Sequence, residues 1–136
     1  MEGVIDLSYE SLSDKSNIPD TVGKGWIAAK LSESDWTIPV SDEALEEINQ
    51  MVALMRNQPL PMLLRNVMDF NIIHLRALYN KVKKVCDCGA GFAVIDKLPI
   101  DEYDIDEMLA VYWVLGQLLG TNVAQKWNGT MIYDVT

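Results

Sequence analysis

Hydrophobic side chains recur at helical spacing in three stretches of the chain, and residues that favour helix ends border each stretch. Ser41 stands at the start of the first stretch as an N-cap, and Pro59 follows its end. Asp104 and Glu107 form a capping-box pair before the third stretch, and Gly120 closes it. The pattern therefore predicts helices over residues 41–57, 69–85 and 105–119. The expected buried faces are Leu45, Ile48, Val52 and Met55 in the first helix, Phe70, Ile73, Ala77, Leu78, Val82 and Val85 in the second, and Ile105, Met108, Leu109, Tyr112, Leu115 and Leu119 in the third.

Shorter β-prone runs lie between and after these helices, and they predict short strands. The predicted strands cover residues 25–31, 92–95, 122–125 and 130–135. Pro39 keeps Ile38 extended before the first helix. Asn128 and Gly129 form a hairpin-type dipeptide between the last two runs. Helices and strands together predict an α+β fold, with residues 92–95 as a buried strand.

The composition of the chain bears on its domain organisation, its partners and its location in the cell. Residues 1–22 are polar, rich in Ser and Asp and without a hydrophobic period, so we expect a loosely ordered arm before one domain over residues 23–136. The net charge of −9 repels phosphate backbones and argues against a nucleic-acid partner. The start of the chain lacks the pattern of a signal peptide, and no apolar run is long enough for a membrane span. We therefore expect a cytoplasmic protein without a membrane partner.

Few residues offer catalytic or metal-binding chemistry. His74 is the single histidine of the chain, and its neighbours Ile73 and Ala77 indicate a packed or capping residue rather than a catalytic base. Cys86 and Cys88 form a Cys-x-Cys pair, which either takes part in metal or redox chemistry or is simply reduced at the end of a helix. No second cysteine pair completes a zinc site. The residues alone thus indicate an acidic α+β domain with no self-sufficient active site.

Four motifs occur in an order that is familiar from one enzyme family. They are DWTIPVSDEALEEI at 35–48, GFAVIDKLPID at 91–101, WVLGQLLG at 113–120 and AQKWNGTMIYDVT at 124–136. From about Trp26 onward, the chain resembles the N-terminal part of the TauD/TfdA-like (taurine dioxygenase-like) family of Fe(II)- and 2-oxoglutarate-dependent oxygenases. The order and spacing of the four motifs carry this resemblance more than any single motif does.

The resemblance implies a jelly-roll (double-stranded β-helix) oxygenase in which helices brace part of the fold, and this chain holds only part of it. Such enzymes use Fe(II) and 2-oxoglutarate to oxidise a small organic substrate, and two histidines and one carboxylate hold the iron. In the family the His-x-Asp pair comes after the matched stretch. This chain contains no His-x-Asp, and Arg76 stands two residues after His74. We therefore expect no metal ligands and no catalytic residues in this chain, which should be inactive alone.

The same resemblance places Gln125, Lys126 and Asn128 near the substrate mouth of the completed enzyme. Many relatives carry an asparagine where this chain has Lys126, which could instead attract an anionic substrate. The other interpretation is that Gln125 and Asn128 satisfy backbone groups of a turn. Trp127 would line a pocket or cap the hairpin.

Three accounts of the chain remain open at this stage. It is the N-terminal segment of an oxygenase, or a subunit that completes or regulates a partner carrying the metal residues. Alternatively it is a non-catalytic interaction domain, which binds its partner by adding a strand to an exposed edge such as the β-prone run MIYDVT.

Overall fold

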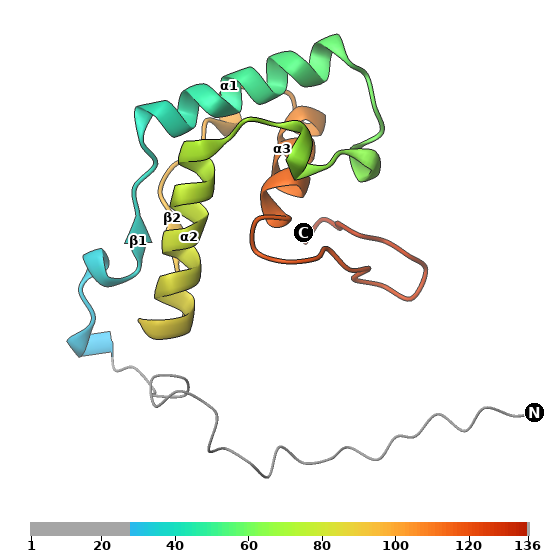
Figure 1. Cartoon of the computed structure of the whole chain (residues 1–136). Coiled ribbons are helices and arrows are strands. Elements are labelled where there is room, and N and C mark those ends of the chain that lie inside the picture. The colour runs from blue at the N-terminus through green and yellow to red at the C-terminus, as the bar shows by residue number, and fades with distance from the viewer. Residues whose placement is uncertain (1–27, 136) are drawn as a thin grey trace, which may run out of the picture.

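A computed structural model describes residues 28–135 of the protein, and within them the fold is α+β and mostly helical (Figure 1). The three α-helices are α1 (Asp42–Asn57), α2 (Ile73–Cys88) and α3 (Ile105–Gly116), and the two strands are β1 (Thr37–Ile38) and β2 (Val94–Ile95). Short 3-10 helices occupy Ala28–Lys30, Glu33–Asp35, Met62–Leu64, Val67–Asp69 and Ile100–Glu102. The expected arm over residues 1–22 and the start of the strand expected over 25–31 lie outside the described residues.

The strands are fewer and shorter than the sequence predicts. Ala28–Lys30 forms a 3-10 turn instead of part of a strand, and only Val94–Ile95 of the run 92–95 pairs as a strand. The expectation that this strand is buried is wrong for Val94, whose exposed fraction is 46%. Residues 122–125 and 130–135 form no strand. An isolated hairpin is marginal without further strands or a helix to cover it, and this turn lies in a largely exposed part of the chain.

The strands β1 and β2 pair in parallel, with Thr37 opposite Val94 and Ile38 opposite Ile95. Backbone hydrogen bonds flank the pair: the Val94 N–H donates to the Trp36 carbonyl at 2.8 Å, and the Asp96 N–H donates to the Ile38 carbonyl at 2.9 Å. Just before the two strands begin, the rings of Trp36 and Phe92 lie 5.8 Å apart between centroids. Parallel strands require a crossover connection, and here α1 and α2 provide it (Figure 1).

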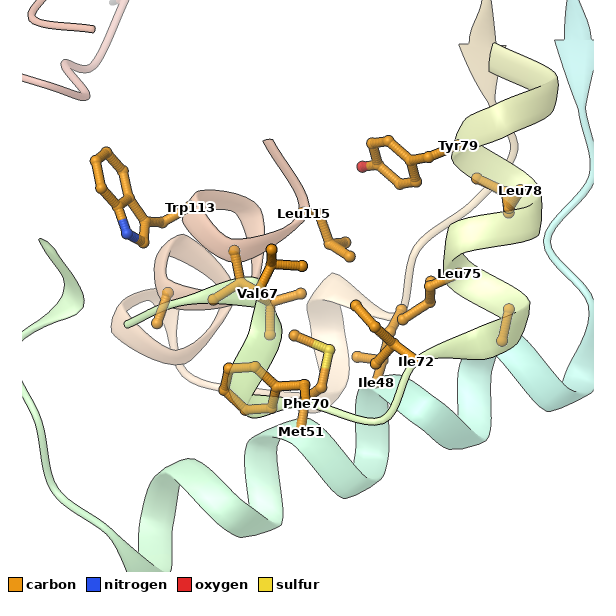
Figure 2. Close-up of a cluster of buried hydrophobic side chains, with 14 of the residues drawn as sticks. Ile48, Met51, Val67, Phe70, Ile72, Leu75, Leu78, Tyr79, Trp113 and Leu115 are labelled. Atoms are coloured by element: carbon orange, nitrogen blue, oxygen red, sulfur yellow. The ribbon is translucent and has the colours of Figure 1, made fainter. Parts of the chain in front are cut away.

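One hydrophobic core joins the three helices and the segment between α1 and α2, residues 58–72, which we call the connector. Figure 2 shows side chains from these four parts of the chain projecting into a common space. The largest fully buried side chains are Ile48, Met51, Ile72, Leu75, Leu115, Val52, Val111 and Val114. Burial of each such side chain contributes about 1.5–3 kcal/mol, so this core supplies the main stabilisation of the fold.

The helix α1 follows the sequence prediction, whereas α2 starts later and buries only part of its expected face, including Leu78 and Val82. The Ser41 side chain accepts a hydrogen bond from the Ala44 N–H at 3.2 Å, as an N-cap does. The α2 helix begins at Ile73 rather than residue 69, because residues 67–69 form a 3-10 turn and Phe70 is extended. Ile73 and Ala77 are exposed, contrary to the expected face. The buried α2 residues are Leu75, Leu78, Tyr79 and Val82.

The largest difference from the expected pattern concerns α3. The helix ends at Gly116 rather than residue 119 and buries Ala110, Val111, Trp113, Val114 and Leu115. Most of the face that the periodicity assigns to the core points to solvent, including Ile105, Leu109, Tyr112 and Leu119. Apolar residues occur on all sides of α3, so periodicity cannot identify which side meets α1 and α2.

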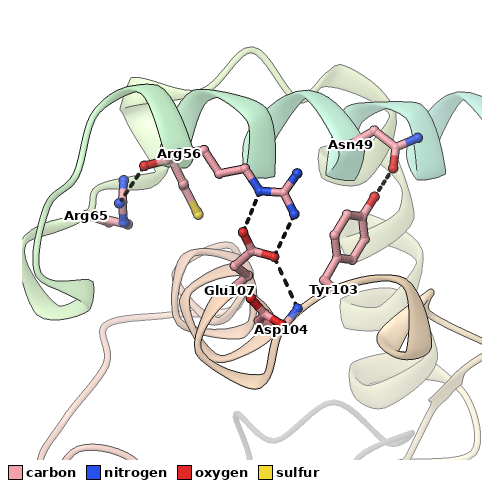
Figure 3. Close-up of polar contacts among 7 residues, drawn as sticks. Asn49, Arg56, Arg65, Tyr103, Asp104 and Glu107 are labelled. Atoms are coloured by element: carbon pink, nitrogen blue, oxygen red, sulfur yellow. Dashed lines mark hydrogen bonds and ion pairs between the residues drawn. The ribbon is translucent and has the colours of Figure 1, made fainter.

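Polar contacts fix α1 against α3 and the connector (Figure 3). The Arg56 guanidinium binds the Glu107 carboxylate with two hydrogen bonds, of 2.6 and 3.0 Å. The Tyr103 hydroxyl donates to the Asn49 side-chain oxygen. On the other side, Arg65 donates to the Met55 and Gln58 carbonyls at 3.4 and 3.3 Å. Arg65 thereby satisfies carbonyls that the end of α1 leaves without helical partners.

No helix among the described residues combines the length and the apolar character that crossing a membrane requires.

Candidate functional site

A hollow of about 340 Å³ lies between α3 and the segment that follows it, residues 117–135, which we call the C-terminal segment. Its volume falls at the lower end of the range that small-molecule sites occupy. The lining residues are Tyr112, Trp113, Gly116, Asn122, Val123, Gln125, Met131, Ile132 and Tyr133. The hollow therefore combines aromatic rings, aliphatic side chains and two carboxamides.

The inner wall of the hollow depends on a close approach between Gly116 and Asn122. The Asn122 side-chain amide donates to the Trp113 carbonyl at 3.0 Å, which fixes the C-terminal segment to the last turn of α3. A Cβ atom on Gly116 would lie 3.1 Å from the Asn122 side-chain oxygen, which is closer than most such contacts. Glycine at this position thus lets the segment fold back against the helix.

The outer wall continues into a tight turn over residues 126–129, which has Trp127 and Asn128 at its centre and Gly129 at its end. The Gln125 N–H donates to the Thr130 carbonyl at 2.7 Å, and the Gly129 N–H donates to the Lys126 carbonyl at 3.0 Å. Gly129 has a φ of +86°, a conformation that glycine adopts without strain. The sequence prediction of a turn at this dipeptide is therefore confirmed, although strands do not flank it.

The three residues expected near a substrate lie within this turn, and two of them contribute to the hollow or its rim. Gln125 lines the hollow, and its side-chain amide donates to the Val123 carbonyl at 3.0 Å. The Lys126 ammonium lies 4.6 Å from the ring centroid of Tyr133, another lining residue. This distance permits a cation–π attraction.

Asn128 instead serves the turn itself. Its side-chain oxygen accepts hydrogen bonds from the Thr130 N–H at 3.1 Å and from the Thr130 hydroxyl at 2.7 Å. These contacts fit the interpretation that Asn128 satisfies backbone groups of the turn. Trp127 is fully exposed and neither lines the hollow nor covers the turn. The hollow can thus bind through rings and amides, and its lining offers no carboxylate, imidazole or thiol for proton transfer.

The described residues do not fit the iron site that the family resemblance implies. Such a site needs two imidazoles and a carboxylate on one face of the metal. Across residues 28–135, no group of three or more His, Cys, Asp and Glu side chains is placed to hold a metal ion. His74 has a different role, because its ring Nδ1 lies 2.9 Å from a carboxylate oxygen of Glu47. Cys86 and Cys88 are exposed, free thiols at the end of α2.

Glu47 is a structural centre that sequence reasoning missed. It projects from α1 to the start of α2, where its carboxylate accepts hydrogen bonds from the His74 N–H at 2.9 Å and the Leu75 N–H at 2.8 Å. Only 8% of its surface is exposed. Burial acts to raise the pKa of Glu47, but the hydrogen bonds from His74 and Leu75 outweigh it and lower this pKa below its ordinary value. A glutamate in a polar stretch of an amphipathic helix gives no local signal of such a role.

Gln117 is a second residue that the sequence did not single out, although it lies within the motif WVLGQLLG. Its side-chain oxygen accepts from the Val67 N–H at 3.0 Å, and its side-chain nitrogen donates to the Arg65 carbonyl at 2.9 Å. The indole N–H of Trp113 donates to the same carbonyl at 3.2 Å. The start of the C-terminal segment is therefore bound to the connector as well as to α3.

Comparison of the chain with models of known protein families found no match, and a search of curated proteins found no significantly similar sequence.

Proposed function

We propose that this chain is the N-terminal part of a TauD/TfdA-like Fe(II)- and 2-oxoglutarate-dependent oxygenase of jelly-roll fold that oxidises a small organic substrate. The metal-binding residues are supplied outside this chain, by the remainder of the oxygenase or by a complementary chain. On this proposal the 136-residue chain alone is inactive, because its sequence holds one histidine and no His-x-Asp pair.

The parallel pairing of β1 with β2 is the observation that carries the proposal. Two of the motifs behind the family resemblance, DWTIP and GFAVID, are far apart in the sequence. In the fold they lie side by side, through the β1–β2 pair and the ring contact of Trp36 with Phe92. Motifs that share one structural unit are more informative about a family than motifs scattered over a surface, and this supports the proposal.

Within the completed enzyme, the turn at residues 125–130 would stand at the substrate mouth. Gln125 lines the hollow and offers an amide, and Lys126 offers a positive charge at its rim. Asn128 shapes the turn through its contacts with Thr130. In a chain of net charge −9, a lysine at the rim would favour a substrate with a carboxylate or another anionic group.

The complete gene product, with any chain that co-purifies with it, provides the test. Its sequence should contain a His-x-Asp pair and a later histidine and arginine. Supplied with Fe(II), 2-oxoglutarate and O2, it should release succinate, whereas the 136-residue chain alone should release none. A complete product without these residues would overturn the proposal, and so would succinate formation by the 136-residue chain alone.

Lys126 offers a more local test once a substrate is known. Lys126→Gln should raise KM for an anionic substrate and leave kcat unchanged, because the substitution removes attraction but no reacting group. Lys97→Gln provides a matched control, since Lys97 is an exposed lysine between β2 and α3, outside the turn at residues 125–130. An equal effect of both substitutions would contradict the assignment of Lys126.

A non-catalytic interaction domain is the second candidate, and one observation favours it. Among residues 28–135, β1 and β2 pair only with each other, and Val94 remains 46% exposed. An exposed strand edge can accept a strand from another protein. If this is the function, the complete gene product contains no His-x-Asp, and a bound peptide protects from hydrogen exchange those amides of β2 that do not donate to β1.

A further inference from the structure

The last turn of α2 carries both cysteines of the chain. Cys86 and Cys88 are free, exposed thiols separated by a single residue. Within the described residues, Val85 is the last side chain of α2 that packs against the core, and residues 86–89 are exposed. Figure 1 shows this end of α2 on the side of the fold away from α1. The two thiols therefore lie outside the core, where small reagents can reach them.

The spacing of the two cysteines permits a disulfide bond, but not within an intact helix. Residues two positions apart in an α-helix have Cα atoms about 5.4 Å apart, which falls within the disulfide range. Their side chains project about 200° apart around the helix axis, so the Cβ atoms point away from each other. Formation of the bond therefore requires residues 86–88 to leave the helical conformation.

The backbone that follows Cys88 is suited to this rearrangement. The Gly89 and Gly91 N–H groups both donate to the Val85 carbonyl, at 3.0 and 3.2 Å, and close the end of the helix. Glycine has access to the widest range of backbone conformations, and Gly91 already has a φ of +85°. Because residues 86–89 are exposed, this turn can unwind while the core of the fold stays in place.

Two lysines lie one turn before the thiols. Lys83 precedes Cys86 by three residues, and Lys84 precedes Cys88 by four. Residues at these spacings are neighbours on the surface of a helix. Asp87 lies between the cysteines, so two lysines and one aspartate leave a net charge of +1 at this end of α2. In a chain of net charge −9, this local positive charge favours an anionic reagent.

We propose that Cys86 and Cys88 form a reversible dithiol–disulfide site that reacts with small anionic disulfides, of which glutathione disulfide is the probe. The thiolate of one cysteine attacks glutathione disulfide, forms a mixed disulfide and releases one glutathione thiolate. The thiolate of the other cysteine then attacks the protein sulfur of the mixed disulfide and releases the second glutathione thiolate. Each cysteine loses one proton, the protein dithiol is oxidised by two electrons, and glutathione disulfide is reduced to two thiols.

The same geometry makes the protein disulfide easy to reduce. Exposed or strained disulfides have higher reduction potentials and are the labile ones. A bond that requires the end of α2 to unwind belongs to this kind, so reduced glutathione reverses it. The site thereby switches the end of α2 between a helical turn and an open loop. It does not depend on the proposed function.

Incubation of the protein in buffers of rising glutathione disulfide content tests the chemistry. Mass spectrometry of the peptide that contains both cysteines should show the loss of two hydrogens without added glutathione, and excess reduced glutathione should restore the thiols. In Cys88→Ser, the same buffers should leave glutathione attached to Cys86. Thiols that persist in the wild type, glutathione attached to both cysteines, or disulfide-linked dimers would overturn the proposal.

Hydrogen exchange measures the structural response. In the disulfide form, the Gly89 and Gly91 amides should exchange faster because they lose their helical acceptor, whereas the amide of the buried residue Leu78 should be unchanged. A variant with both cysteines replaced by serine, taken through the same oxidation, provides the control and should show no change. Unaltered exchange at Gly89 and Gly91 in the disulfide form would overturn the proposed switch.

The rate of disulfide exchange tests the lysines. The double variant Lys83→Gln/Lys84→Gln should react several-fold more slowly with glutathione disulfide and at an unchanged rate with the uncharged hydroxyethyl disulfide. Lys97→Gln, which alters an exposed lysine between β2 and α3, is the matched control and should react like the wild type. Equal rates of the double variant and the wild type with glutathione disulfide would overturn the preference for anionic disulfides.

Discussion

Glu47 and His74 join the middle of α1 to the start of α2 through a single carboxylate. One oxygen of Glu47 lies 2.9 Å from both the backbone nitrogen and the ring Nδ1 of His74, and the other oxygen accepts from the Leu75 N–H at 2.8 Å. The α2 helix has no N-cap bond from its own preceding residue. Glu47 therefore supplies from another helix the acceptor that a local N-cap residue would normally provide.

Replacement of Glu47 by alanine should lower the free energy of unfolding by about 2 kcal/mol near neutral pH, because backbone donors at the start of α2 lose their acceptor. The folded-state pKa of Glu47 lies below its ordinary value of 4.5, so its ionised form stabilises the fold. That stabilisation is complete well above pH 4.5 and is lost as the pH falls through the folded pKa. Denaturant unfolding over this pH range measures the effect.

Glu47→Gln is the matched control for charge. It keeps an acceptor oxygen and should therefore lower the free energy of unfolding less than alanine does. Because glutamine does not titrate, this variant should also lack the loss of stability at acidic pH that Glu47 causes. Identical pH profiles of the wild type and Glu47→Gln would contradict this account. His74→Ala, which retains the backbone donors, should have a smaller effect than Glu47→Ala.

Tyr79 should limit the stability of the fold at alkaline pH. Burial, with a smaller contribution from Tyr112, raises the pKa of Tyr79 from 10.0 to about 12. The folded state therefore holds this proton more tightly than the unfolded state does. The resulting stability is fully present below pH 10 and is lost as the pH rises through about 12.

Ultraviolet titration of tyrosinate and unfolding at alkaline pH both measure this property. Tyr79→Phe should remove the late-titrating phenol and reduce the alkaline loss of stability. Tyr133→Phe is a suitable control, because Tyr133 is exposed and lies outside the core. An unchanged alkaline profile in Tyr79→Phe would refute the assignment.

The Arg56–Glu107 pair should couple α1 to α3. Its hydrogen bonds raise the pKa of Arg56, and the hydrogen bond from Arg56 is the main cause that lowers the pKa of Glu107. A double-mutant cycle of Arg56→Ala and Glu107→Ala should give a favourable coupling energy that added salt reduces, because the Arg56 side chain is largely exposed.

Arg56→Lys should recover only part of this coupling, since an ammonium cannot form the same two parallel hydrogen bonds. The cycle is needed because the Glu107 carboxylate also accepts from the Asp104 N–H at 3.1 Å, so that Glu107→Ala disturbs two contacts. A coupling energy of zero at low salt would show that the pair does not stabilise the fold.

Thr37→Val should stabilise the protein. Within residues 28–135, the buried hydroxyl of Thr37 has no hydrogen-bond partner. Replacement of this hydroxyl by a methyl group removes an unsatisfied polar atom and keeps a β-branched side chain in β1, and it should raise the free energy of unfolding by about 1 kcal/mol. Thr37→Ser keeps the hydroxyl and should give no gain. Thermal unfolding of both variants decides the matter, and a less stable valine variant would contradict the expectation.

The ends of α1 and the turn near Asn128 could be predicted from the sequence, because each depends on residues close by in the chain. Ser41 and Pro59 bound α1, and the helix runs from Asp42 to Asn57 within those limits. Asn128 and Gly129 mark a turn because the Asn128 side chain accepts from the Thr130 N–H and Gly129 adopts a positive φ without strain. In each case the residues that determine the structure lie within a few positions of it.

Tertiary contacts determined what the sequence could not predict. The start of α2 depends on Glu47, which lies on another helix, and the fold of the C-terminal segment depends on the bond from Asn122 to Trp113. The buried side of α3 depends on which partner it meets, because its hydrophobic residues surround the axis. The candidate site shows the same limit: the turn residues were predictable, but the hollow beside them was not.

The parallel β1–β2 pair has a consequence for the order in which the chain folds. Two paired residues on each strand are too few to persist alone, and the chain between them contains both α1 and α2. The entropic cost of closing that long loop falls once the two helices have packed. We therefore expect the strand pair to form late, so that Trp36 and Phe92 meet only in a chain whose helical core is already in place.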